Sequence, residues 1–439
     1  MGPCDTVTTM TGMLRAGSVA ITMAASAACN EPALEVCAGP PADPAPAVST
    51  SCVQSCGAQE DAPVCSGTCG SQLEFEWFVE LSEAPCTREP VVAAEVPGWV
   101  LVAGGQRGES GGTLFSITGL GSDGCVQWVD IEEEQADVVS PASLVLGVSG
   151  SADVGYYAVG HFTEWTGVTF GRREQVWIRR YSPAGDILWT RRERTDTPQV
   201  ASAVMVDGAG DAVVVGGGPT GGHSRGWLRR YSPDGEPRPD ELWLGDGPRT
   251  HILDVVGARD GRLWLSFYVS DGTYSRPWLA GLGADGQVAW LREVEDATAG
   301  SGRLALLAED SPVFLEHDYF DSLRVSRWSA DGETQWVRGF NGLPGVKLRR
   351  ATTTPEGLII AAGSTDRANR SEPAVVIFAS DGAVRGIQRI PGVEHGTAGD
   401  VARGPDGTLY FTGLSHHYDA DSPLVPARCM AWVASARAP

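Results

Sequence analysis

Hydrophobic and polar positions alternate in a pattern that recurs along the 439 residues of the chain. Six times an aromatic-rich segment runs into an Asp-Gly or Ala-Gly turn, and a second alternating segment follows. The turn glycines stand 61, 50, 51, 46 and 50 residues apart, and they are Gly124, Gly185, Gly235, Gly286, Gly332 and Gly382. A seventh unit begins near Asp400 and stops before its last strand. A repeat of about 50 residues built from short strands is typical of a β-propeller.

Each unit predicts four strands. The first ends at a tight turn such as Asp207-Gly208, and the second is apolar throughout, as in residues 212–215. Such runs favour strands that are buried on both faces between neighbouring blades. The third strand, for example residues 177–181, leads into a Ser-Pro-Ala-Gly or Ser-Pro-Asp-Gly turn, whose glycine suits a hairpin.

The missing strand of the seventh unit stands ahead of the first complete unit. Residues 73–81 form an alternating segment that contains Trp77. This tryptophan fits the position that other units fill four residues after the turn glycine, with Trp128, Trp189, Trp290 and Trp336. The sequence therefore predicts an all-β fold: a seven-bladed β-propeller over residues 73–439, closed by an N-terminal strand that leaves no open edge.

A turn glycine followed four residues later by tryptophan resembles the tryptophan-docking repeats of PQQ-like propellers. The resemblance covers residues 73–435 and implies that each tryptophan packs against the next blade. That family includes quinoprotein dehydrogenases and a lipoprotein scaffold of outer-membrane assembly, and its members usually have eight blades. This chain lacks the vicinal cysteine pair that some of the dehydrogenases use. No quinone or other cofactor is therefore predicted.

The N-terminal region predicts export. Arg15 precedes an apolar run over residues 16–28, which has the length of a signal-peptide core. Ser26-Ala27-Ala28-Cys29 resembles the lipobox of bacterial lipoproteins, with serine where leucine is usual, and implies a lipid on Cys29. The alternative is a plain secretory signal that is cleaved after Ala27 or Ala28. We expect a signal peptide over residues 1–28, a Pro/Ala-rich tether over 29–51 and a disulfide-rich segment over 52–72.

The cysteine count favours the lipoprotein interpretation. Of ten cysteines, Cys4 leaves with the signal and Cys29 is acylated, so an even number remains for disulfides. Cys52, Cys56, Cys65 and Cys69 form the N-terminal cluster, for which zinc binding is the alternative to disulfides. Antiparallel pairing of the closing strand would bring Cys86 and Cys429 together, and we predict a disulfide between them. Cys125 is expected to pair into the cluster.

The net charge of the chain limits the classes of partner that it can bind. A formal net charge of −22 argues against nucleic acid and against an anionic membrane surface. No stretch reaches the ~18 apolar residues of a membrane-spanning helix. We therefore expect an exported monomer at the bacterial cell envelope that contacts the membrane only through its lipid anchor.

The longer loops of the repeats should all lie on one face of the propeller, where ligands usually bind. They carry the candidate ligand-binding residues His161, Trp165, His223, His317, Asp318, Tyr319, His416, His417 and Tyr418. Asp419 and Asp421 offer hard oxygen ligands for calcium, without the full ligand series of a known loop. Because no catalytic motif is present, the sequence predicts an envelope-associated binding or scaffold module for a protein or glycan. The alternative is a propeller enzyme, either a lyase or hydrolase or a remote quinoprotein, that uses histidines and carboxylates at the channel mouth.

Overall fold

The computed structural model describes most of the chain from Leu73 onward. The described residues are 73–84, 89–107, 113–131, 144–165, 172–193, 195–220, 223–245, 249–258, 260–272, 274–295, 301–307, 310–317, 323–340, 346–367, 370–419 and 422–438. They all belong to one compact unit, Pro41–Pro439. Their secondary structure is entirely β, as the sequence predicts. Among these residues, no helix is long and apolar enough to cross a membrane.

The strands follow one another in groups of four. The first two groups are β2 (Val91–Ala93), β3 (Trp99–Arg107), β4 (Thr113–Gly121), β5 (Val126–Ile131), then β6 (Leu144–Ser151), β7 (Gly155–Trp165), β8 (Arg172–Tyr181), β9 (Ile187–Glu193). The next two are β10 (Val200–Val206), β11 (Ala212–Thr220), β12 (His223–Tyr231), β13 (Leu242–Leu244), then β14 (Arg249–Gly257), β15 (Leu263–Ser270), β16 (Ser275–Leu282), β17 (Val288–Glu293).

The remaining groups complete the ring. They are β18 (Ser301–Leu306), β19 (Pro312–His317), β20 (Leu323–Trp328), β21 (Thr334–Phe340), then β22 (Val346–Thr353), β23 (Ile359–Arg367), β24 (Arg370–Phe378), β25 (Val384–Arg389), and finally β26 (Gly396–Arg403), β27 (Thr408–Asp419), β28 (Ser422–Arg437) with β1 (Glu74–Ala84).

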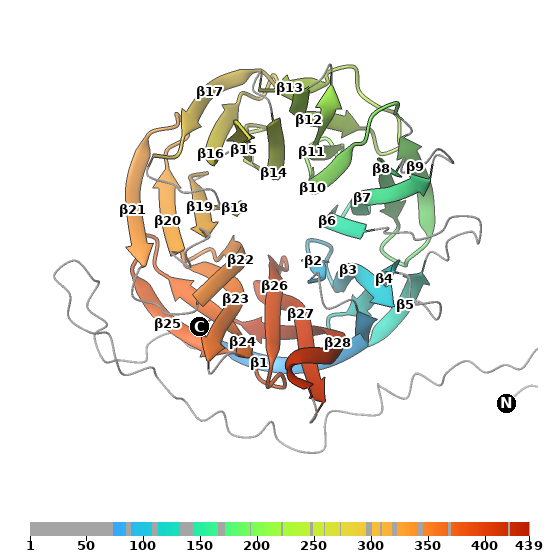
Figure 1. Ribbon diagram of the computed structural model, residues 1–439, viewed down its shortest axis with the longest axis vertical. Coiled ribbons are helices and arrows are strands. Elements are labelled where there is room, and N and C mark those ends of the chain that lie inside the picture. The colour runs from blue at the N-terminus through green and yellow to red at the C-terminus, as the bar shows by residue number, and fades with distance from the viewer. Residues whose placement is uncertain are drawn as a thin grey trace, which may run out of the picture. The chain divides into compact units, whose positions relative to one another are not determined.

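Hydrogen bonding arranges these strands as antiparallel blades around an axis (Figure 1). Five sheets have four strands each, and one has eight. The eight-stranded sheet consists of β10–β13 and β14–β17, which a single parallel pair, Ser224 with Arg249, joins. The described strands therefore make seven groups of four. Strands β2, β6, β10, β14, β18, β22 and β26 lie innermost (Figure 1).

The ring closes through the N-terminal strand, as predicted. β1 pairs antiparallel with β28, next to β27 and β26 from the other end of the chain. It runs from Glu74 to Ala84, slightly beyond the predicted 73–81. Leu73 also binds the preceding blade, because its N–H donates to Gln388 Oε1 and its carbonyl accepts from Gln388 Nε2, both at 2.8 Å. The closing strand is thus held on two sides.

Tryptophans on the outermost strands bind the turn of the following blade. Trp77 Nε1 donates to the Ser122 carbonyl at 3.0 Å, which carries the closing strand onto the first blade. The same contact recurs for Trp189 with Pro233, Trp290 with Ala330 and Trp336 with Ser380, at 2.7, 2.9 and 3.1 Å.

The turn glycines leave space for the tryptophans of the outermost strands. Gly185 has φ +94°, and a Cβ there would lie 2.5 Å from the Trp128 ring. This position therefore needs glycine both for its backbone conformation and for the close approach of the indole.

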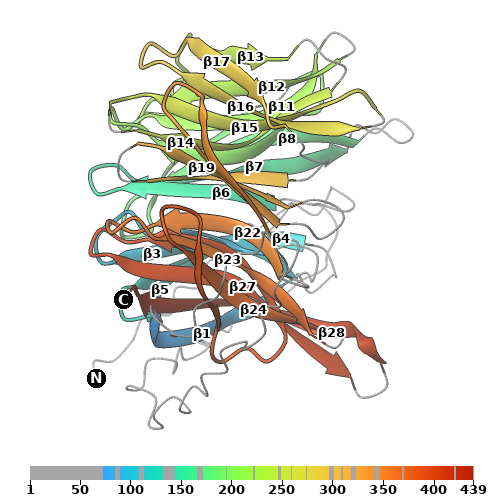
Figure 2. The same cartoon turned by 90° about the vertical axis from the view of Figure 1, so that its left-hand side faces the viewer.

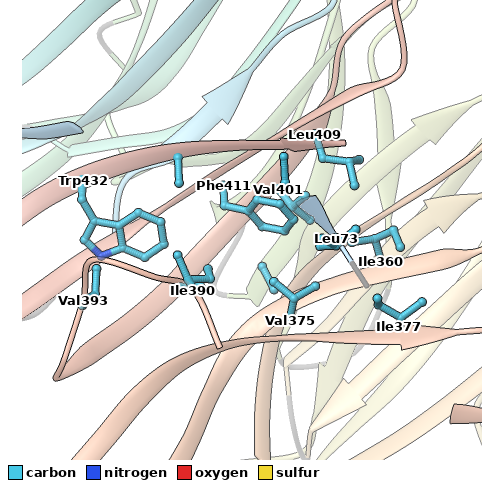
Figure 3. Packing of buried hydrophobic residues seen from close by; sticks show 14 residues of the cluster. Leu73, Ile360, Val375, Ile377, Ile390, Val393, Val401, Leu409, Phe411 and Trp432 are labelled. Atoms are coloured by element: carbon cyan, nitrogen blue, oxygen red, sulfur yellow. The ribbon is translucent and has the colours of Figure 1, made fainter. Parts of the chain in front are cut away.

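Most of the core lies between neighbouring blades. Figure 3 shows one such cluster, where Val375 and Ile377 of β24 pack near Val401 of β26 and Phe411 of β27. Apolar second strands such as β11 are buried on both faces, which explains their continuous hydrophobic pattern.

Two described cysteines, Cys125 and Cys429, are disulfide-bonded. Cys86, the N-terminal cluster, the tether and the signal with Cys29 lie outside the described residues. Cys429 pairs with Ala84 in the middle of β28, which begins at Ser422. Cys86 stands two residues after Ala84 but is not among the described residues. The Cys86–Cys429 disulfide therefore stays a prediction.

Candidate functional site

Four consecutive blades place a charged side chain at the same level of their innermost strands. Each is the fourth residue from the end of its strand, and together they are Asp254 of β14, Arg303 of β18, Arg350 of β22 and Asp400 of β26. The equivalent residue of β10 is Ala203. Charge is therefore concentrated on one part of the ring.

Arg350 connects the two aspartates of this layer. Its Nη1 lies 3.0 Å from Asp254 Oδ1, and its Nε lies 3.9 Å from Asp400 Oδ1. Burial alone would lower the pKa of Arg350, but the charges of Asp254 and Asp400 raise it. Burial raises the pKa of Asp400, against the effect of Arg350. The guanidinium thus stays charged in a position where little water reaches it.

The aspartates also bind the backbone of the next blade. Asp254 Oδ2 accepts the N–H of Leu304, and Asp400 Oδ2 accepts the N–H of Val92, each at 3.0 Å. Both contacts cross from one innermost strand to the next. The polar layer therefore fixes the spacing of the blades around the axis.

Arg303 carries a second positive charge into this layer. Its Nη1 donates to the carbonyl of Leu253. Burial, and then repulsion from Arg350, lower the pKa of Arg303 to about 10. The side chain is still charged at neutral pH, and it also acts on a histidine of the neighbouring strand.

That histidine, His251 of β14, forms a short contact with a serine of β10. Its Nε2 lies 2.6 Å from Ser202 Oγ. Ser202 stands between Ala201 and Ala203, where the pairing of β10 with β11 shifts by one residue. Such a bulge redirects the side chain of the extra residue. It turns Ser202 toward the adjacent blade.

The His251 ring is held by its surroundings. It stacks on Tyr268 with ring centroids 5.8 Å apart, and a Cβ at Gly217 would lie 2.3 Å from its Nδ1. Burial, and then the charge of Arg303, lower the pKa of His251 to about 4. The imidazole is therefore neutral near pH 7, and its Nε2 can accept the proton of the serine hydroxyl. A hydroxyl that donates to a neutral imidazole is the arrangement of an activated nucleophile.

Only part of the predicted ligand-binding set comes together. His416 and Tyr418 lie on β27 with ring centroids 6.3 Å apart, and Tyr418 also contacts His395 at 5.7 Å. His417 points away from this group, since its Nε2 lies 3.7 Å from Glu80 Oε1. Alternate residues of a strand face opposite sides, which explains the split.

The other predicted residues do not join this group among the described side chains. His161 is buried in β7, opposite Leu144. The side chains of Trp165, His223, His317 and Asp419 lie outside the described part, although their strand positions are known, and Asp318, Tyr319 and Asp421 lie wholly outside it. No cluster of three or more potential metal ligands occurs among the described residues. The calcium prediction at Asp419 and Asp421 is thus not tested.

Sequence reasoning missed Ser202, His251 and the charged layer. A signal for the layer was present, since the first strands of four successive repeats each have a charged residue as the fourth from their end. No sequence signal pointed to Ser202, because its orientation depends on a bulge and its partner belongs to another repeat.

Comparisons with known proteins found similar solved structures. No family model and no curated protein matches the chain. A gluconolactonase from Xanthomonas campestris is 15% identical and covers 83% of this chain and 99% of its own, with a TM-score of 0.39. A calcium-binding regucalcin from Agrobacterium tumefaciens is 14% identical and covers 68% and 92%, with a TM-score of 0.42.

These names correct one prediction. The sequence suggested a binding or scaffold propeller without catalytic function, whereas the two similar structures bear the names of a gluconolactonase and a calcium-binding protein. At this level of identity, any catalytic role has to rest on the side chains of the chain itself.

Proposed function

We propose that this protein is a hydrolase of carboxylic esters, with Ser202 as nucleophile and His251 as general base. The observation that carries the proposal is the 2.6 Å contact between Ser202 Oγ and His251 Nε2, on the innermost strands of two adjacent blades. The enzyme alternative of the sequence analysis was a lyase or hydrolase, or a remote quinoprotein, that uses histidines and carboxylates at the channel mouth, and a hydrolase with a histidine base falls within it.

The reaction has two steps. His251 Nε2 takes the hydroxyl proton while Ser202 Oγ attacks the ester carbonyl, and the C–O bond to the alcohol then breaks. The imidazolium returns its proton to the leaving alcohol, and an acyl group remains on Ser202. Water then attacks the acyl carbon, gives a proton to His251, and releases the carboxylic acid as the proton returns to Ser202.

Arg303 is the residue that we assign to charge stabilisation. It is charged, it acts electrostatically on His251, and it stands one blade further along the ring. A fixed positive charge favours the oxyanion that develops during attack. The same charge keeps His251 neutral, which makes it available as a base but limits its strength.

The test is hydrolysis of p-nitrophenyl acetate by the purified protein. We expect Ser202→Ala and His251→Asn to lower kcat/KM by at least about 100-fold, the range typical of general-base catalysis. Ser435→Ala is the matched control, because Ser435 is a buried serine whose hydroxyl has no hydrogen-bond partner among the described residues. It should keep wild-type activity.

A fluorophosphonate probe provides an independent readout. It should modify the peptide that contains Ser202 in the wild-type protein and in Ser435→Ala, but not in Ser202→Ala. Equal hydrolysis by wild type and Ser202→Ala, or labelling elsewhere, would refute the assignment.

The location and family features of the sequence remain proposals. We propose an exported protein that is anchored to the bacterial envelope through a lipid on Cys29. The indole contacts of Trp77, Trp189, Trp290 and Trp336 with the next blade support a relationship to tryptophan-docking repeats of the PQQ-like kind. Metabolic labelling with a fatty-acid analogue, compared between the wild type and Cys29→Ala, tests the anchor.

A further inference from the structure

A second group of side chains lies far along the ring from Ser202, on the last two blades. It consists of Arg370 at the start of β24, His395 between β25 and β26, and His416 and Tyr418 on β27. The His416 N–H donates to the His395 carbonyl at 2.8 Å, so the loop that carries His395 is fastened to β27. We call these four residues the Arg370 cluster.

The contact between Arg370 and His395 defines the protonation of the histidine. Arg370 Nη1 lies 2.8 Å from His395 Nε2. A guanidinium only donates hydrogen bonds, so Nε2 must be the unprotonated nitrogen and the ring proton must lie on Nδ1. His395 Nδ1 is buried and has no hydrogen-bond partner among the described residues. An N–H group that can donate is thus left unused.

Arg370 also lacks a negatively charged partner. Its contacts within the described part of the chain are the neutral His395 and the ring of Tyr418, whose centroid lies 5.0 Å from Arg370 Cζ. Other arginines of this blade behave differently, since Arg389 Nη2 lies 2.6 Å from Glu372 Oε2. Arg370 therefore keeps a half-buried charge and several free N–H groups.

The nearby carboxylates do not fill this role. Glu394 Oε1 lies 3.9 Å from His395 Nε2, and its side chain is 91% exposed. Glu89, which acts on His416, already pairs with Arg349 at 3.4 Å. The Arg370 cluster therefore holds a positive charge that has no carboxylate partner among the described residues, and aromatic contacts fix the side chains around it.

We propose that the Arg370 cluster binds an oxyanion, the carboxylate or phosphate group of a small ligand. Two oxygens on one atom match the two parallel N–H groups of a guanidinium, and a planar fork of this kind gives strong, oriented binding. The contact of Arg370 Nη1 with His395 Nε2 holds the guanidinium in one orientation, so its remaining N–H groups are offered to the ligand. The site involves none of the residues assigned to ester hydrolysis.

The test uses inorganic phosphate and acetate as separate probes of the full-length protein. NMR of ¹⁵N-labelled histidines should show His395 as the Nδ1–H tautomer before either anion is added. Titration at constant ionic strength should then shift the His395 signals saturably, with a Kd in the millimolar range for such small ions. Saturation with phosphate alone or with acetate alone would identify the group that the site prefers.

Substitutions of Arg370 test whether the shift of the His395 signals depends on its guanidinium. Arg370→Gln should weaken binding at least tenfold, and Arg370→Lys should fall between it and the wild type because it keeps the charge without the fork. Arg389→Gln is the matched control and should bind as the wild type does. Hydrolysis of p-nitrophenyl acetate should be the same in all three variants, so this proposal and the ester-hydrolase proposal fail independently.

Three results would overturn the proposal. They are an Nε2–H tautomer of His395 in the free protein, no saturable shift with either anion, and equal binding by the wild type and Arg370→Gln.

Discussion

Arg350 on β22 forms an ion pair with Asp254 on β14, at 3.0 Å between Nη1 and Oδ1. The two strands belong to different sheets and are separated along the chain by the whole group β18–β21. The contact therefore spans the axis side of an intervening blade. It joins parts of the ring that are not adjacent, and Arg350 also lowers the pKa of Arg303, which belongs to the candidate site.

Replacing Arg350 should destabilise the fold strongly. In Arg350→Met, the buried carboxylates of Asp254 and Asp400 lose their positive partner. Leaving a buried charge unpaired costs about 3 kcal/mol or more in free energy of unfolding. Urea denaturation measures this loss. The exposed pair of Arg276 and Glu293 is the comparison, since Arg276→Gln should cost less than about 1 kcal/mol. Equal losses in both variants would contradict the structural role of Arg350.

The contribution of the indole hydrogen bonds to stability should be measurable separately from that of indole packing. Trp290 Nε1 donates to the Ala330 carbonyl, whereas Trp128 Nε1 is buried without a partner among the described residues. Both tryptophans occupy equivalent positions of their blades. Trp290→Phe should therefore cost about 1 kcal/mol more in unfolding free energy than Trp128→Phe. Equal costs would mean that the hydrogen bond adds nothing to packing.

One tight turn carries avoidable strain. Asp310 has φ 60°, while the equivalent turns place Gly210, Gly261, Gly357 and Gly407 in the left-handed region. Residues with a Cβ are disfavoured there by about 1–2 kcal/mol. Asp310→Gly should therefore raise the free energy of unfolding by up to about 1 kcal/mol, after the greater chain entropy of glycine is counted. Thermal unfolding checks the sign, and a lower Tm would show that the Asp310 side chain is needed.

Glu95 should make stability depend on pH near neutrality. Its pKa is raised to about 7, mainly by burial and also by Asp400, although N–H groups of the backbone oppose the rise. The folded protein thus binds a proton that the unfolded chain loses above pH 4.5. The resulting stabilisation is full below pH 4.5 and is lost as pH rises through about 7.

The Glu95→Gln variant removes this dependence. Although the surrounding protein raises this pKa, the Glu95 residue is itself exposed, so solvent screens the effect, which should be on the order of 1 kcal/mol or less. The difference in Tm between the wild type and Glu95→Gln should shift in favour of the variant between pH 5 and pH 8. A constant difference across that interval would exclude the assignment.

The pH profile of ester hydrolysis should report His251. Because the pKa of His251 is about 4, kcat/KM should be level near pH 7 and fall by up to tenfold per pH unit below about pH 4. Arg303→Gln removes the neighbouring charge, so it should move this limb to higher pH and lower the plateau. A limb near pH 6.5 in the wild type would mean that another histidine is the base.

Local sequence patterns predict much of this fold. The period near 50 residues, the apolar second strands and the tryptophan four residues after four of the six turn glycines determine the propeller, because each repeat specifies its own strands and turns. The closing strand is predictable for the same reason: Trp77 has the pattern of the other outermost strands, and its contact with Ser122 matches theirs. The sequence analysis placed His416 and Tyr418 on a long loop, whereas both lie on β27, where alternation along the strand puts them on one side.

Only the tertiary structure shows which residues come together in the candidate site. Ser202 meets His251 because a bulge in β10 turns one hydroxyl toward the next blade, and no residue near Ser202 in the sequence reveals this. Arg370 meets His395 and Tyr418 because three separate segments converge beside β27. The protonation of His251 depends likewise on burial and on Arg303 of another blade. The repeat thus determines strands and their order, whereas chemistry arises where unlike residues from different repeats come within hydrogen-bonding distance.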